Sequence, residues 1–153
     1  YVADAYGHRI QKFSKEGTLV TQWGSQGIGP GQFNYPEGVA LDGAGNVLVA
    51  ETYNRRIQKF TDQGQYLSQW GSEGSGPGQF EYPLGITVDN YGYVYVADNN
   101  NDRIDVFSSD GAHLTALPGP ITTPGGLATD GWGHVYVVDS DNNQVERFAR
   151  HIP

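Results

Sequence analysis

The chain has 153 residues, of which 37% are hydrophobic and 12% aromatic, so its composition fits a folded domain and excludes a disordered tail. Seventeen acidic and nine basic side chains give a net charge of −8, which disfavours partners that carry phosphate, both nucleic acids and anionic membranes. The sequence contains no cysteine, which excludes disulfides, thiolate metal sites and thiol nucleophiles, and it contains no apolar run of roughly 18 residues that could span a membrane.

The predicted elements are short strands that recur along the chain. A first motif, rich in Val and Tyr and ending in an acidic residue, occupies residues 1–4, 48–51, 95–98 and 136–139. The first residues of these segments lie 47, 47 and 41 positions apart. A second motif follows each of them at the same offset, over residues 9–13, 56–60, 103–107 and 144–148. Repetition with a period of about 40 to 50 residues is typical of a propeller or another tandem array.

One complete unit shows the internal pattern of the repeat. Its strand candidates are residues 39–42, 47–51, 56–60 and 66–70, with Gly, Asp and Asn turn signals between them. No stretch shows sustained helical periodicity. Four antiparallel strands per repeat predict an all-β protein whose units are the four-stranded blades of a β-propeller.

The combined pattern is G-x-V-Y-V-A-D, R-I-Q-K-F, G, W-G, G-x-G-Q-F and P-x-G, and it resembles the NHL repeat over nearly the whole chain. This resemblance implies a ring of blades, most often six. It also implies that one face of the ring, made by the turns between strands b and c and by the loops between blades, carries the functional site.

The strands are unevenly distributed over the predicted blades, if strand a is the innermost and strand d the outermost. The chain reads b-c-d, a-b-c-d, a-b-c-d and a-b-c, which gives 14 strands in a single repeat domain. The predicted blade boundaries are 1–35, 36–82, 83–123 and 124–153. Because the first residue is not Met and lies within a strand pattern, we expect that the chain either belongs to a longer ring or associates with itself through its open flanks.

Several repeated motifs favour a structural interpretation. The Gly-rich segments 24–33 and 71–80 lack the helix and lysine of a phosphate loop, so we interpret them as crossings from an outer strand to the next inner strand. Arginine recurs at the start of strand c, and we expect it to pair with the acidic residue that ends strand b: Arg9 with Asp4, Arg56 with Glu51, and Arg103 with Asp98. The aromatic residues predicted to lie in the core between blades are Phe13, Phe60, Phe107, Trp23 and Trp70.

The sequence does not predict a metal or cofactor site. Residues 98–102 and 139–143 place oxygen ligands at alternate positions, as a calcium loop does, but the required Gly and Glu are absent further along. The four histidines fall at different blade positions and are His8, His113, His134 and His151. Amidating lyases resemble NHL propellers and place a zinc-binding His after Pro in P-x-G, where this chain has Glu37, Leu84 and Gly125. No nucleophile arrangement is visible, so we assign no catalytic residue, no cofactor and no metal.

The resemblance and the charge together favour a binding scaffold for a protein or peptide. The residues predicted to lie on the binding face are Tyr6, His8, Glu37, Tyr53, Arg55, Asn100, Asp102 and Asp141. The alternative is a lactonase-like or lyase-like enzyme with a metal in the central channel, to which Glu37 alone would contribute here. RNA binding, which the resemblance also allows, is less compatible with the negative charge.

Overall fold

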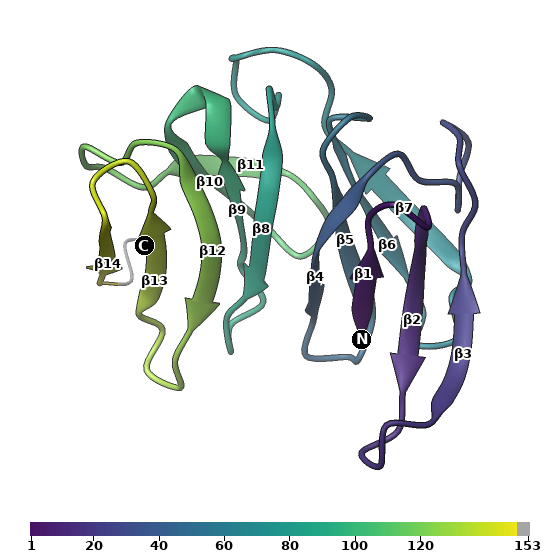
Figure 1. Cartoon of the computed structure of the whole chain (residues 1–153). Coiled ribbons are helices and arrows are strands. Elements are labelled where there is room, and N and C mark those ends of the chain that lie inside the picture. The colour runs from purple at the N-terminus through teal and green to yellow at the C-terminus, as the bar shows by residue number, and fades with distance from the viewer. Residues whose placement is uncertain (150–153) are drawn as a thin grey trace.

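The computed structural model describes residues 1–149 and contains four antiparallel sheets that follow one another along the chain (Figure 1). Each sheet is one blade. Blade 1 contains β1 (Val2–Asp4), β2 (Arg9–Phe13) and β3 (Leu19–Trp23). Blade 2 contains β4 (Pro36–Leu41), β5 (Val47–Glu51), β6 (Arg56–Phe60) and β7 (Tyr66–Trp70). Blade 3 contains β8 (Pro83–Val88), β9 (Val94–Asp98), β10 (Arg103–Phe107) and β11 (His113–Ala116), and blade 4 contains β12 (Pro124–Thr129), β13 (Val135–Asp139) and β14 (Gln144–Phe148).

The fold is therefore an incomplete β-propeller, as the strand pattern predicted. Within each blade, strands adjacent in sequence are adjacent in the sheet, and the inner strands β4, β8 and β12 lie side by side. The short 3₁₀ turn η1 (Asn99–Asn101) interrupts the connection between β9 and β10. In the part of the chain that is described, no helix is long and apolar enough to cross a membrane.

The inner strands begin earlier than the sequence predicted. The strand expected over residues 39–42 runs from Pro36 to Leu41. Pro36 pairs with Glu51 at the start of the ladder, and the register then shifts before Gly38. Proline is tolerated there because the first residue of a strand need not donate to the ladder. Asp42 lies outside the strand because its carboxylate accepts the N–H groups of Ala44 and Asn46 in the following turn.

The hydrophobic core lies between the blades and consists of side chains that alternate between the two faces of each sheet. Successive residues of a strand point to opposite faces of its sheet, so each middle blade contacts a neighbour on both sides. Every residue of β5 and β9 is consequently buried. Val47 and Val49 pack with Ile10 of blade 1, whereas Leu48 and Ala50 belong to the cluster shared with blade 3.

The aromatic core residues follow this rule, with one correction. Phe60 and Phe107 are fully buried, and Trp23 and Trp70 pack against the clusters on either side of blade 2. Phe13 is 38% exposed, so its assignment to the core was wrong. It occupies the same strand position as Phe60, but within residues 1–149 no blade covers the corresponding face of blade 1.

The Gly-rich segments are crossings between blades, as predicted, and an arginine holds each in place. Residues 24–33 connect β3 to β4. The guanidinium group of Arg56 donates to the carbonyl oxygens of Ile28, Gly29 and Gln32 at 2.7 to 3.1 Å and to Glu51 Oε1 at 2.7 Å. Strand c of one blade thus fixes the loop that arrives from the preceding blade.

The predicted arginine–carboxylate pairs form in blades 1 and 2 but differ in blade 3. Arg9 Nε lies 2.8 Å from Asp4 Oδ2. Arg103 Nε instead donates to Asp105 at 2.8 Å, and its Nη2 is 3.9 Å from Asp98. Asp105 replaces the glutamine found at this position in blades 1 and 2, and this added carboxylate draws the guanidinium group away from Asp98.

Candidate functional site

One face of the molecule, here called the b–c turn face, consists of residues 5–8, 52–55, 99–102 and 140–143 together with the first residues of β4, β8 and β12. It forms the upper edge in Figure 1. Each turn ends in a residue with a φ of 50 to 54°, and these residues are His8, Arg55, Asp102 and Asn143. Four different side chains adopt this left-handed conformation, so the repeat geometry imposes it and leaves the side chain free to vary.

An aromatic cluster covers the part of this face that blades 1 to 3 contribute. Tyr35 lies at its centre, with ring centroids 5.1 Å from Tyr6, 5.6 Å from His8 and 4.8 Å from Tyr53. Tyr53 in turn lies 6.1 Å from Tyr82, and all four pairs have edge-to-face geometry. Such contacts fix the rings relative to one another. The cluster is nevertheless open to solvent, since Tyr6 is 84% exposed and Tyr53 is 46% exposed.

Glu37 lies beside this cluster at the start of β4, in a pocket of about 250 Å³ between the inner strands. The pocket is lined by the two residues after proline in each P-x-G motif: Glu37, Gly38, Leu84, Gly85, Gly125 and Gly126. A side chain at Gly38 would overlap the carbonyl oxygen of Leu84, and one at Gly85 would overlap that of Gly125. These glycines allow the close approach of the inner strands, which brings the three P-x-G segments together.

The carboxylate of Glu37 acts electrostatically on two of the tyrosines. Burial is the first cause that raises the pKa of the Tyr35 phenol, and the nearby Tyr6, Tyr53 and Glu37 raise it further. Burial also raises the pKa of Tyr82, with Tyr53, Glu37 and Tyr35 as additional causes. Both phenols therefore stay neutral at physiological pH, and both lie within the field of the same carboxylate.

The backbone conformation of the residue before each P-x-G proline depends on the last residue of the b–c turn in the preceding blade. The N–H of Tyr35 donates to His8 Nδ1 at 3.4 Å, and the N–H of Thr123 donates to Asp102 Oδ1 at 2.8 Å. Both have positive φ, 54° for Tyr35 and 45° for Thr123. In blade 2 the equivalent turn residue is Arg55, whose side chain has no acceptor atom. The N–H of Tyr82 therefore donates to Asp98, and the φ of Tyr82 is not positive. A single turn residue thus sets the backbone that carries the aromatic ring of the next blade.

The structure brings together only some of the predicted face residues. Tyr6, His8, Glu37 and Tyr53 meet around Tyr35. Arg55 points to Glu73, at 3.6 Å, in the crossing between blades 2 and 3. Asp102 and Asp141 make contacts with Thr123 on the far side of the face, where Asp141 donates its N–H to the threonine hydroxyl, and Asn100 is exposed in its turn.

The donor groups of the described residues do not assemble into a metal centre. Residues 1–149 contain no group of three or more His, Cys, Asp or Glu side chains that could hold a metal ion. His113 Nε2 lies 2.9 Å from Asp105, and His134 Nδ1 lies 2.7 Å from Asp130, so each histidine has a separate carboxylate partner. His151 lies outside the described residues. The zinc position of the amidating lyases is occupied by one carboxylate, a leucine and a glycine, a set that does not fit zinc.

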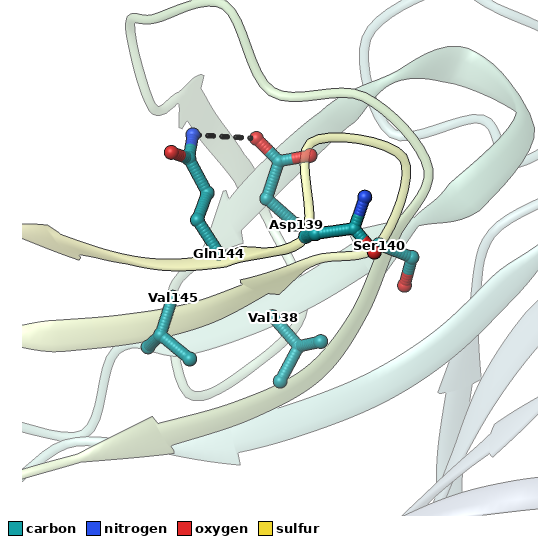
Figure 2. A pocket seen from close by; sticks show the side chains of 6 residues that line it. Val138, Asp139, Ser140, Gln144 and Val145 are labelled. Carbon is teal, nitrogen blue, oxygen red and sulfur yellow. Dashed lines mark hydrogen bonds between the residues drawn. The ribbon is translucent and has the colours of Figure 1, made fainter.

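A second depression, of about 470 Å³, lies on the flank of blade 4 (Figure 2). Val138 and Val145 lie on one side of the β13–β14 hairpin, and Asp139 and Gln144 lie on the other. Asp139 accepts from Gln144 at 3.4 Å, whereas Val138 and Val145 are exposed. This is the sheet face that a following blade would cover, and Asp139, Ser140, Asn143 and Gln144 line the depression together with the two valines.

The comparison with protein families agrees with the geometry of the blades. The NHL-repeat model matches residues 33–60 and 80–107, which run from the crossing into blades 2 and 3 through to strand c. The chain contains NHL repeats. No curated protein matches the sequence significantly.

Solved structures similar to these NHL repeats include bacterial lyases. A streptogramin B lyase superposes with a TM-score of 0.68 at 19% identity, over 97% of this chain and 50% of that one. A catalytically inactive virginiamycin B lyase from Staphylococcus aureus with quinupristin gives 0.67 at 17% identity, over 94% and 49%. A protein of unknown function from Bacteroides caccae gives 0.61 at 16% identity, over 93% and 54%. The chain spans about half the length of these structures, and the similarity establishes the propeller fold.

Two members of the aromatic cluster, Tyr35 and Tyr82, were not predicted from the sequence. Both precede the proline of P-x-G, and Thr123 occupies the same position in the last repeat. Tyrosine at this place in two repeats, directly before a motif assigned to the channel, was the signal that could have identified them. Their contact with Tyr53 depends on how neighbouring blades pack, which the repeat alignment does not show.

Proposed function

We propose that this propeller binds a protein or peptide partner on its b–c turn face, through the aromatic cluster of Tyr6, His8, Tyr35, Tyr53 and Tyr82. The observation that carries the proposal is the exposure of a packed set of tyrosines. Tyrosine supplies a large contact area at a low cost in side-chain entropy, and it is enriched at protein interfaces. Here the rings are already fixed against each other, so binding would order little that is not ordered already.

The neighbouring polar groups support the same interpretation. Glu37 and Arg55 lie at the edge of the cluster with opposite charge and can orient a partner. Asn100, Asp102 and Asp141 extend the face across blades 3 and 4 as a polar rim. An interface with an aromatic centre and a polar edge is the arrangement found in specific complexes.

The test is a selection of random peptides displayed on phage against the full chain, followed by affinity measurements on the selected peptides. We expect Tyr53→Ala and Tyr6→Ala to weaken binding at least about tenfold, as at an interface hot spot. Trp132→Ala is the matched control, because Trp132 is an aromatic residue of similar exposure, 81%, in the turn between β12 and β13. Peptides that lose affinity in the control and keep it in the tyrosine variants would refute the proposed site.

The alternative of a channel-metal enzyme is not favoured by any observation on the described residues. Glu37 is the sole carboxylate among the residues that line the pocket between the P-x-G motifs. The lyases to which the fold is similar share at most 20% identity with this chain, which supports the fold alone. We expect elemental analysis of protein prepared without chelator at neutral pH to find less than stoichiometric zinc. One zinc per chain would contradict this prediction and revive the enzyme alternative.

A further inference from the structure

Glu37 is a charged group at the edge of the aromatic cluster, and no cation of the described chain neutralises it. Its side chain is exposed, and residues 1–149 supply no ion pair or hydrogen bond to its carboxylate. The nearby basic side chains pair with other carboxylates. Arg55 lies 3.6 Å from Glu73, and Arg56 is buried against Glu51 and the crossing loop.

The rings around Glu37 present groups that suit a cation. Tyr35 and Tyr53 lie 4.8 Å apart, and Tyr53 and Tyr82 lie 6.1 Å apart, with interplanar angles of 71° and 79°. Edge-to-face packing sets the planes of neighbouring rings at steep angles, so their faces point in different directions. The face of an aromatic ring carries negative charge density and attracts a cation within about 6 Å. Phenol oxygens add hydrogen-bond acceptors.

The pocket beside these rings has room for a small group. Its volume is about 250 Å³, and Leu84, Gly125 and Gly126 line it together with Glu37. The two glycines place no side chain there, and the leucine is apolar, so no second charge competes with Glu37. The net charge of −8 adds a long-range field that concentrates cations near the molecule.

We propose that Tyr35, Tyr53, Tyr82 and Glu37 form a binding site for an organic cation, an ammonium or guanidinium group. On the proposed peptide-binding function, on which this assignment rests, the group is the side chain of a lysine or arginine in the partner. A free amine offers the same chemistry. Glu37 supplies the counter-charge, the tyrosine faces supply cation–π contacts, and Leu84 contacts the aliphatic stem.

The assignment predicts the response to small probes. The full chain is titrated with Nα-acetyl-lysine amide, Nα-acetyl-arginine amide and the uncharged analogue Nα-acetyl-norleucine amide, and the tyrosine ring resonances are followed by NMR. We expect the two cations to bind and to shift the resonances of Tyr35, Tyr53 and Tyr82, and we expect norleucine to bind at least about tenfold more weakly. Added salt should weaken the binding, because the site is open to solvent.

Variants separate the contributions of charge and ring. Glu37→Gln, which removes the charge and keeps the shape, should weaken cation binding about tenfold. Tyr53→Phe should retain most of the affinity and Tyr53→Leu should lose it, because the ring face and not the hydroxyl attracts the cation. Trp132→Ala is the control and should bind as the parent does. Equal binding of norleucine and lysine amides, or full affinity in Glu37→Gln, would overturn the assignment.

Failure of this inference and failure of the peptide-binding proposal are distinguishable. Selected peptides that require Tyr53 and lack basic residues would refute the cation site and leave the peptide-binding face standing. Cation binding that requires Glu37, with no peptide selected, would support the site as a receptor for a free amine and would count against a peptide partner.

Discussion

The strands Arg9–Phe13 and Arg56–Phe60 have the same sequence, RIQKF, and the same position in their blades, yet they have different environments. The side chain of Arg56 is 8% exposed and donates to five carbonyl or carboxylate partners, whereas that of Arg9 is 39% exposed and donates to Asp4 and Gln22. Phe60 is fully buried and Phe13 is not. The local sequence therefore fixes the strand, and the presence of a preceding blade decides what the strand contributes to stability.

The largest expected effect concerns the uncovered flanks themselves. Blade 1 exposes Val2 and Phe13, and blade 4 exposes Val138 and Val145, on faces that a neighbouring blade covers elsewhere in the molecule. Exposed apolar faces and open sheets promote association. Light scattering of the isolated chain at micromolar concentration should show species larger than the 16.6 kDa monomer.

Charge on a flank should reverse this association. Phe13→Glu and Val145→Glu should each shift the distribution toward the monomer, and Tyr6→Glu, on the b–c turn face, should not. A monodisperse, well-folded monomer of the parent chain would contradict the prediction and would require another explanation for the exposed flanks.

The next effect compares the two phenylalanines directly. Phe60→Ala removes a fully buried ring and should lower the free energy of unfolding by about 3–5 kcal/mol. Phe13→Ala should cost less than about 1 kcal/mol, because solvent already reaches the ring. Denaturant titration monitored by circular dichroism measures both. A loss below about 1 kcal/mol for Phe60→Ala would show that the assigned packing between blades 1 and 2 is wrong.

Arg56 and Arg9, which begin the two identical strands, should also differ in their contribution to the free energy of unfolding, but by less than the two phenylalanines. Arg56→Ala leaves the buried carboxylate of Glu51 without its cation and releases the crossing loop, so we expect a loss of about 3 kcal/mol. Arg9→Ala breaks a half-exposed pair and should cost at most about 1 kcal/mol. Equal losses in denaturant titration would mean that the crossing loop is held by other contacts.

The smallest expected effect concerns Asp130, whose hydrogen bonds all lie within blade 4 and do not depend on a neighbouring blade. Burial alone would raise the pKa of Asp130, but hydrogen bonds from His134, from the Trp132 N–H and from Tyr136 lower it to about 2. The unfolded value is about 3.9, so the contribution to stability is present above that pH and is lost as the pH falls toward 2. Unfolding titrations between pH 5 and 2 should show a smaller acid loss for Asp130→Asn than for the parent. An identical acid profile would indicate that other carboxylates control the transition.

Much of the fold could be predicted from the sequence because its signals are local. The alternation of apolar residues, the turn residues and the 41- to 47-residue spacing gave the number, order and pairing of the strands. The Gly-rich crossings were predicted from the absence of a helix and a lysine, and Arg56 then proved to hold one of them. The strand boundaries were predicted less accurately, since the inner strand begins at Pro36 and not at Val39.

The candidate site was predicted only in part. The face followed from the repeat, and Tyr6, His8, Glu37 and Tyr53 do lie together, but Tyr35 and Tyr82 were missed. Arg55 and Asp102 have the same place in the repeat and different roles: Arg55 pairs with Glu73, and Asp102 accepts the N–H of Thr123. A repeat alignment gives a residue its position, and the contact that it makes depends on the blade beside it.

The sequence by itself determined that the chain forms NHL-type blades, because strand alternation, turn chemistry and repeat period are properties of neighbouring residues. The tertiary structure alone decided which copy of a repeated residue is buried, which copy of the arginine holds a crossing loop, and which rings meet around Tyr35. The physical reason is that burial and ring packing arise between blades, from surfaces whose residues are about 20 to 50 positions apart in the chain. Identical pentapeptides can therefore share their local conformation and differ in burial and in their contacts with other blades.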